Sequence, residues 1–99
     1  LNDRKNELVK SQDYEEAARW YLKAAEQVNT QALFYAGRMY ERGQGVSQDD
    51  VIALSFYILA SARGEAQATI ERNRLTGWRT PEQVAEAQSL ARDYKIQGK

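Results

Sequence analysis

Hydrophobic residues recur along this chain at the spacing of amphipathic helices. From residue 17 onward they follow steps of three and one, which place them on one broad helical stripe. That stripe comprises Ala17, Trp20, Tyr21, Ala24, Ala25 and Val28. Alternating apolar and polar residues over the length of a strand are absent, and the few short apolar runs lie inside longer helical patterns. The pattern therefore predicts an all-α fold.

The helical pattern repeats along the chain. When the sequence is shifted by 36 residues, ten positions coincide with residues of the same kind. The pairs are Asp13 with Asp49, Ala17 with Ala53, Trp20 with Phe56, Tyr21 with Tyr57, Ala24 with Ala60, Gln31 with Gln67, Ala32 with Ala68, Phe34 with Ile70, Arg38 with Arg74 and Met39 with Leu75. Self-similarity at a fixed period indicates a helical repeat protein, and we expect paired residues such as Trp20 and Phe56 to occupy like environments.

Each repeat is predicted to contain two helices. The first helix of the complete repeat is predicted over residues 30–42, and it ends at the turn Gly43-Gln44-Gly45. Glycine in such a turn permits the left-handed backbone that closes a helix. Gly37 lies in the middle of this helix, where glycine destabilises it by roughly 1 kcal/mol relative to alanine. We expect this glycine to allow another helix to approach closely.

The second helix of the repeat is predicted to begin near Ser47, which is a suitable N-cap. Asp49 and Asp50 follow within its first turn and complement the helix dipole. The helix is predicted to end at Gly64, a candidate C-cap.

Two further helices are indicated by capping patterns. In the helix that precedes the complete repeat, Asp13 and Glu16 are spaced as a capping box. In the last helix, Thr80 is predicted as the N-cap, Pro81 as the first helical residue, and Gln83 as the residue that completes the capping box with Thr80. The inner stripe of that last helix comprises Val84, Ala87, Ala91 and Tyr94.

Several segments resemble Sel-1-like repeats, which belong to the tetratricopeptide-like helical repeats. The second helix of such a repeat is similar to residues 13–27, DYEEAARWYLKAAEQ, and its first helix and glycine turn are similar to residues 32–46, ALFYAGRMYERGQGV. Residues 47–68 resemble another second helix, with Phe56 where tryptophan is usual. Residues 75–94, LTGWRTPEQVAEAQSLARDY, resemble the C-terminal segment that caps such arrays.

The resemblance implies a right-handed α-α superhelix, or solenoid, of about two and a half helix pairs with a C-terminal capping helix. Residues 1–99 would form one helical-repeat domain, divided into a leading partial repeat over 11–29, a full repeat over 30–64 and a capping repeat over 65–95. Proteins of this kind usually act as adaptors or scaffolds, and their first helices line the concave surface. We expect the chain to be the C-terminal part of a longer array.

The segment of the first ten residues departs from the repeat pattern, because it is shorter than a first helix with its turn and contains no glycine. The helix at 13–28 is therefore predicted to lack its usual partner, although its apolar stripe needs a cover. Either further repeats precede it, or two copies of the chain pair through this face as a homodimer.

Composition narrows the chemistry that the chain can support. The 14 basic and 14 acidic residues balance, which speaks against a nucleic-acid binder. The absence of cysteine and histidine excludes disulfides, thiolate and imidazole zinc sites, and serine–histidine or cysteine–histidine nucleophiles. The longest uncharged stretch, residues 51–62, is too short to span a bilayer. We predict no metal, no cofactor and no membrane insertion, whereas cytoplasm and periplasm of a bacterium fit equally well.

A candidate partner-binding surface follows from the first helices. Between their packing stripes, arginine and apolar residues recur in register, a combination that suits a peptide or helix with carboxylates beside apolar anchors. The candidate residues are Gln31, Phe34, Arg38, Glu41 and Arg42, with Gln67, Ile70, Arg74 and Trp78 at 36-residue offsets.

Plainer interpretations of these residues stay open. Arg38 and Arg74 could pair with the neighbouring Glu41 or Glu71, and the apolar candidates could belong to the core. Trp78 could plug the last turn as part of the cap, or stand in the groove as a binding hot spot.

Two other classes of function find little support. The adjacent acids Glu15/Glu16 and Asp49/Asp50 point about 100° apart on a helix, and are expected at helix starts. Related cysteine-rich repeat proteins have been proposed to bind or modify cell-wall fragments, which makes a cell-wall role the weaker alternative. The basic residues Arg72, Arg74 and Arg79 beside Trp78 are interspersed with Glu65, Glu71 and Glu82, as on a solvated mixed surface.

The sequence therefore predicts a non-enzymatic protein–protein interaction module, an adaptor, scaffold or regulatory subunit, that binds a protein or peptide in a concave groove. The alternative is a structural module that self-associates through the open helix face. No nucleic-acid partner is expected.

Overall fold

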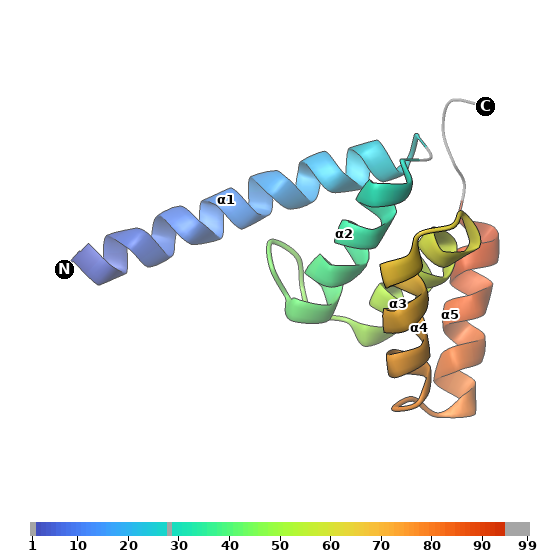
Figure 1. Ribbon diagram of the computed structural model, residues 1–99. Helices are drawn as coiled ribbons and strands as arrows, with labels where there is room; N and C mark the ends of the chain where they lie inside the picture. Colours follow the sequence, from blue (N-terminus) through green and yellow to red (C-terminus); the bar gives the residue numbers. More distant parts are fainter. Residues whose placement is uncertain (1, 28, 95–99) are drawn as a thin grey trace.

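The computed structural model describes residues 2–27 and 29–94, and the side chains of residues 13–27 and 29–94. Five α-helices follow one another along the chain (Figure 1), and no strand occurs in this part of it. The helices are α1 (Asn2–Ala25), α2 (Thr30–Arg42), α3 (Asp50–Ala62), α4 (Ala66–Thr76) and α5 (Pro81–Asp93). The predicted all-α fold is confirmed.

The bounds of α2 are those that the sequence predicts. The side chain of Asn29 caps its start by accepting a hydrogen bond from the backbone N–H of Ala32 at 2.9 Å. At its end Gly43 has a φ of 67°, and its N–H donates to the carbonyl of Met39. The left-handed glycine turn is thus present where it was expected.

The start of α3 lies later than predicted. Asp49, not Ser47, is the N-cap, and its Oδ1 accepts from the backbone N–H groups of Val51 and Ile52, both at 3.0 Å. A carboxylate satisfies two unpaired amides here and also complements the helix dipole, so it caps better than the serine hydroxyl. The helix ends at Ala62, just before the left-handed Gly64.

The predicted start of the preceding helix is wrong. α1 runs without a break from Asn2 to Ala25, so Asp13 lies inside the helix and not at its N-cap. An amide inside a helix already donates to a carbonyl four residues earlier, and a capping box has no role there. The predicted end at Val28 falls on a residue outside the described ones.

The predicted capping box of α5 is confirmed. The N–H of Gln83 donates to Thr80 Oγ1, and the side chain of Gln83 accepts from the N–H of Thr80, each at 3.1 Å. Ala87 and Ala91 of the predicted stripe are buried.

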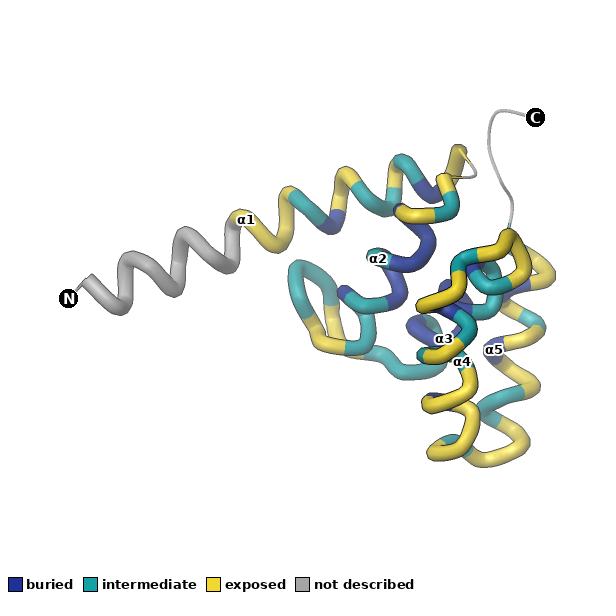
Figure 2. The backbone as a smooth tube through the Cα atoms, viewed as in Figure 1, coloured by how far each residue is buried: buried dark blue, intermediate teal, exposed yellow. Residues whose placement is uncertain are grey.

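α3 lies at the centre of the bundle and packs on α2, α4 and α5, whereas α1 packs on α2. Buried residues accordingly concentrate on α2 and α3 (Figure 2), and the largest fully buried side chains are Tyr57, Leu33 and Leu54. The first half of α1 extends away from the other helices (Figure 1).

Gly37 brings α2 and α3 together, as predicted. A Cβ atom at this position would lie 2.7 Å from Cε1 of Tyr57 and 3.2 Å from the carbonyl oxygen of Ala53. Any side chain here would therefore push the buried tyrosine ring out of its place.

Residues 36 positions apart occupy like environments in some pairs but not in all. Ala32 and Ala68 are both buried, but Trp20 is 75% exposed while Phe56 is 6% exposed. The expectation for this last pair is wrong. The ring of Phe56 lies 5.9 Å from that of Tyr40 on the preceding helix α2, whereas within the described residues no helix precedes α1 to cover Trp20.

None of the described helices is long and apolar enough to cross a membrane.

Candidate functional site

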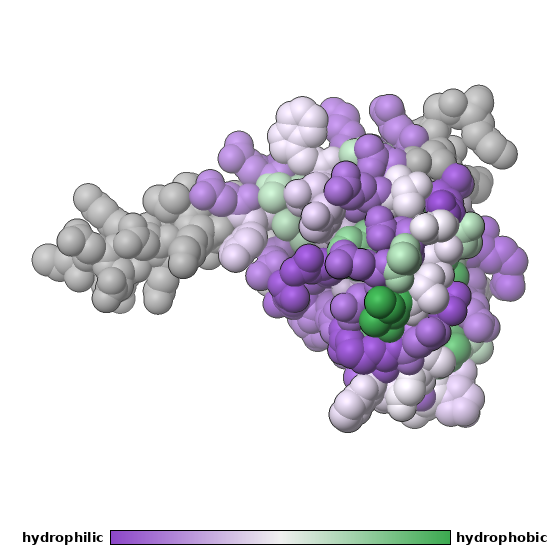
Figure 3. Space-filling model, in the orientation of Figure 1, coloured by the Kyte–Doolittle hydropathy of each residue, from purple (hydrophilic) through white to green (hydrophobic). Residues whose placement is uncertain are grey.

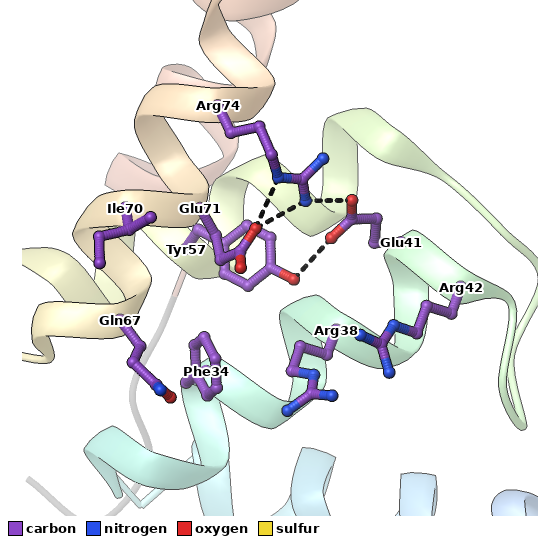
Figure 4. Close-up of a pocket in the computed structure, with 9 residues that line it drawn as sticks. All are labelled: Phe34, Arg38, Glu41, Arg42, Tyr57, Gln67, Ile70, Glu71 and Arg74. Atoms are coloured by element: carbon purple, nitrogen blue, oxygen red, sulfur yellow. Dashed lines mark hydrogen bonds and ion pairs between the residues drawn. The ribbon is translucent and has the colours of Figure 1, made fainter.

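A pocket of about 280 Å³ lies between α2 and α4 (Figure 4). Side chains from both helices form its walls, and Tyr57 of α3 lies behind them. The lining residues are Phe34, Arg38, Glu41 and Arg42 from α2, Tyr57 from α3, and Gln67, Ile70, Glu71 and Arg74 from α4. Seven of the nine candidate residues therefore come together in one place.

Helical spacing aligns the α2 side of the pocket. Residues 34, 38, 41 and 42 are separated by steps of four, three and one, which place them on one side of a helix. The caps at Asn29 and Gly43 fix both ends of this short helix and hence the direction of its side chains.

A hydrogen-bonded cluster joins the three helices at one end of the pocket. We call Tyr57, Glu41, Arg74 and Glu71 the Glu41 cluster. The hydroxyl of Tyr57 donates to Glu41 Oε1 at 2.8 Å, and a guanidinium nitrogen of Arg74 donates to Glu41 Oε2. Nε of Arg74 also donates to Glu71 Oε1 at 2.7 Å (Figure 4). The interpretation in which Arg74 pairs with glutamates is therefore correct.

The environment fixes the protonation of two members of the Glu41 cluster. Burial raises the pKa of the Tyr57 hydroxyl well above its ordinary value, and its hydrogen bond to Glu41 raises it further. Hydrogen bonds to Glu41 and Glu71 raise the pKa of Arg74. Tyr57 and Arg74 therefore keep their protons at neutral pH and act as fixed hydrogen-bond donors.

Arg38 differs from its repeat equivalent Arg74. Its guanidinium carbon lies 5.8 Å from the centre of the Phe34 ring and 5.9 Å from that of Tyr35, at the distance of cation–π contacts. Among the described side chains, neither Arg38 nor the exposed Arg42 forms an ion pair. The alternative in which Arg38 pairs with a glutamate is wrong, because its guanidinium lies on the rings of Phe34 and Tyr35 instead.

The apolar candidates also differ from each other. Phe34 is 4% exposed and packs on Tyr57, with ring centres 5.8 Å apart, so it belongs to the core beneath the pocket. Its equivalent Ile70 is 65% exposed. In Figure 3 a small, strongly hydrophobic patch stands out over α4 among hydrophilic side chains, and Ile70 is the exposed aliphatic residue of that helix.

Gln31 and Trp78 are exposed but do not line the pocket. Trp78 lies in the turn between α4 and α5 and is 74% exposed, so it neither plugs that turn nor stands in the pocket. Tyr57 and Glu71 line the pocket without having been candidates. A buried tyrosine needs a partner for its hydroxyl, and this rule could have pointed from Tyr57 to the pocket.

The basic residues near Trp78 are engaged with their neighbours. Arg79 forms an ion pair with Asp50 at 2.9 Å, and Arg72 donates to Ser61 and to Asn73. This surface is the mixed one that the interspersed acids indicated.

The adjacent acids have structural positions. Asp49 caps α3, and Asp50 accepts a hydrogen bond from Gln48 and pairs with Arg79. The expectation that Glu15 and Glu16 lie at a helix start is wrong, because α1 begins at Asn2. No group of three acidic residues that could hold a metal ion occurs among the residues that the structure describes.

The succession of packed helices from α1 to α5 defines the chain as an α-α helical repeat protein. The model of the Sel1 repeat matches residues 8–29 and 30–65, more than half of the chain. The chain belongs to the Sel1 repeat family, which confirms the resemblance found in the sequence. Sel1 repeats generally mediate protein–protein interactions and are typically non-catalytic. No curated protein matches the chain.

Proposed function

We propose that this chain is an adaptor or scaffold module that binds a peptide or helix of a partner protein in the pocket between α2 and α4. The observation that supports the proposal is the meeting of seven candidate residues around one pocket. First helices of successive repeats form its two walls, so a partner segment would contact both repeats at once. We also propose the division into a partial repeat over 11–29, a full repeat over 30–64 and a capping repeat over 65–95.

The exposed Ile70 provides the test. Peptides are first selected from a random display library on the wild-type chain, and their affinities are measured by calorimetry. A charge at position 70 would place a desolvated carboxylate against the bound segment. We expect Ile70→Asp to weaken binding by about tenfold or more, since central apolar contacts dominate such interfaces.

Leu90→Asp is the matched control, because Leu90 is also an exposed aliphatic residue but lies on α5, away from the pocket. We expect this variant to change affinity by less than about twofold, as surface positions outside an interface do. Equal losses in the two variants, or no loss in either, would contradict binding in the pocket.

A second candidate function is self-association through α1, which the exposure of Trp20 favours. A tryptophan on an open helix face is a typical interface residue. If two copies pair there, light scattering should give a mass that rises from 11.3 kDa toward twice that value with concentration. Trp20→Glu should then keep the chain monomeric. A wild-type chain that stays monomeric at the highest concentration would exclude this function.

A further inference from the structure

The geometry points to the chemistry of the partner segment: an acidic, amphipathic peptide whose carboxylate binds to Arg38 and Arg42, and not to Arg74. This assignment rests on the proposed function and specifies which kind of segment the pocket accepts. It departs from the repeat pattern, in which Arg38 and Arg74 are equivalent.

The positive charge of Arg74 is already opposed by more than one negative charge. It donates to Glu41 and to Glu71, so two carboxylates face this one guanidinium. A ligand carboxylate at Arg74 would be repelled by both of them, and the hydroxyl of Tyr57 also holds Glu41 in place. Arg74 therefore braces α4 against α2 and does not recognise a partner.

Arg38 and Arg42, in contrast to Arg74, face no carboxylate of their own in the part of the chain that the structure describes. They are four residues apart on α2 and line the same pocket (Figure 4), and like charges at this spacing repel each other. Neither of them pairs with an acid among the described side chains. A carboxylate bound between them would relieve the repulsion and accept charge-assisted hydrogen bonds.

The side chain of Arg38 is also held in position before a partner binds. Its guanidinium lies against the rings of Phe34 and Tyr35, so less side-chain freedom is lost when it binds. Arginine retains its donor groups when it stacks on aromatic rings, because these groups lie in the plane of the guanidinium.

Ile70 supplies the apolar contact on the opposite wall. Its exposed side chain lies on α4 across the pocket from the two arginines (Figure 4). A segment that fills the pocket would therefore place a hydrophobic side chain on Ile70 and a carboxylate on Arg38 and Arg42. A basic segment would be repelled, since three arginines outnumber two glutamates in the pocket lining and both glutamates are bound to Arg74 and not to Arg38 or Arg42.

The test combines changes in the protein and in the peptide. Peptides selected on the wild-type chain are synthesised with their Asp and Glu residues intact or replaced by Asn and Gln. We expect the selected peptides to contain acids beside hydrophobic residues. The double variant Arg38→Gln/Arg42→Gln should lower the affinity for the acidic peptide about tenfold or more, as loss of a partner from a charge pair does. The amide peptide should bind this variant and the wild type alike.

One control variant completes the design. Arg63→Gln changes an exposed arginine that lies outside the pocket. It should alter the affinity for the acidic peptide by less than about threefold, because Arg63 would not contact the carboxylate of that peptide. Circular dichroism confirms folding, and the single variant Arg42→Gln alters only an exposed side chain.

The outcomes separate this inference from the proposed function. If the selected peptides lack acidic residues but no longer bind the Ile70→Asp variant, the pocket binds peptides and the inference of an acidic partner is wrong. If Arg63→Gln weakens binding as much as the double variant, the assignment to Arg38 and Arg42 is wrong. If no peptide is selected, or if binding is indifferent to Ile70→Asp, the proposed function and the inference both fail.

Discussion

Replacing Tyr57 by alanine is expected to lower the free energy of unfolding by about 3–5 kcal/mol, the range for large aromatic residues in a packed core. Tyr57 is fully buried on the central helix α3 and contacts both Gly37 and Phe34 on α2. Because small domains are stable by only about 5–15 kcal/mol, this loss would remove a large share of the total. Urea denaturation followed by circular dichroism measures it.

The matched control is Tyr14→Ala, which removes an exposed tyrosine and is expected to change stability by less than about 0.5 kcal/mol. Tyr57→Phe separates the ring from the hydroxyl. It keeps the packing and loses only the hydrogen bond to Glu41, for which we expect about 1.5 kcal/mol. A loss in Tyr57→Phe as large as that in Tyr57→Ala would show that the hydrogen bond, and not the ring, holds α2 on α3.

Alkaline denaturation reports on the same hydroxyl. The pKa of Tyr57 lies above that of an unfolded tyrosine, near 10, so the unfolded chain loses this proton first as the pH rises. The stability that the shift contributes is therefore complete below about pH 10 and is lost toward the pKa of the folded residue. The advantage of wild type over Tyr57→Phe should shrink above about pH 10, by up to about 1.4 kcal/mol per pH unit. An unchanged difference up to about pH 11 would contradict the raised pKa.

The elements that the sequence predicted well are those determined by local chemistry. The glycine turn closes α2, the capping box opens α5, and Gly37 lies against α3. Each depends on residues within a few positions or on the absence of a side chain, and such features are readable from the chain alone. The 36-residue offset then supplied the stacking of the helices, and through it the location of the pocket between α2 and α4.

The errors arose where a position has different neighbours in successive repeats. Trp20 and Phe56 are equivalent in sequence, but among the residues that the structure describes only Phe56 has a preceding helix, with Tyr40 on it, to pack against. Phe34 is covered by Tyr57 of the central helix α3, whereas Ile70 remains 65% exposed. A repeat pattern gives the place of a residue in its unit, but exposure depends on which units stand beside it.

The pocket shows the same effect in its charges. Arg38 and Arg74 occupy equivalent places, but only Arg74 has two carboxylates within reach, one from its own helix and one from α2. Arg74 and Glu41 are 33 positions apart, so no local reading of the sequence reveals that they pair. Arg74 therefore braces α4 against α2, whereas Arg38 forms no ion pair among the described side chains.

The second large effect is expected at Gly45, where the glycine turn contacts α1. A Cβ atom here would collide with the carbonyl oxygen of Tyr14, and would lie 2.6 Å from its carbonyl carbon and 2.9 Å from the backbone nitrogen of Glu15. Gly45 also has a φ of 81°, which alanine adopts at a cost of about 1–2 kcal/mol. Backbone atoms of a helix cannot give way as a side chain can. We therefore expect Gly45→Ala to destabilise the chain by that amount plus about 1–3 kcal/mol for the collision.

Gly64→Ala separates these two contributions. Gly64 has a φ of 96°, but nothing lies within 4 Å of the position of its Cβ, so alanine there meets only the backbone cost. Hydrogen exchange of α1 amides should accelerate in Gly45→Ala and stay unchanged in Gly64→Ala, because only the former pushes the turn away from α1. If the two variants lose equal stability and α1 exchanges alike in both, the turn does not hold α1. The packing of Tyr21 on Tyr35, with ring centres 5.0 Å apart, would then have to fix this helix on its own.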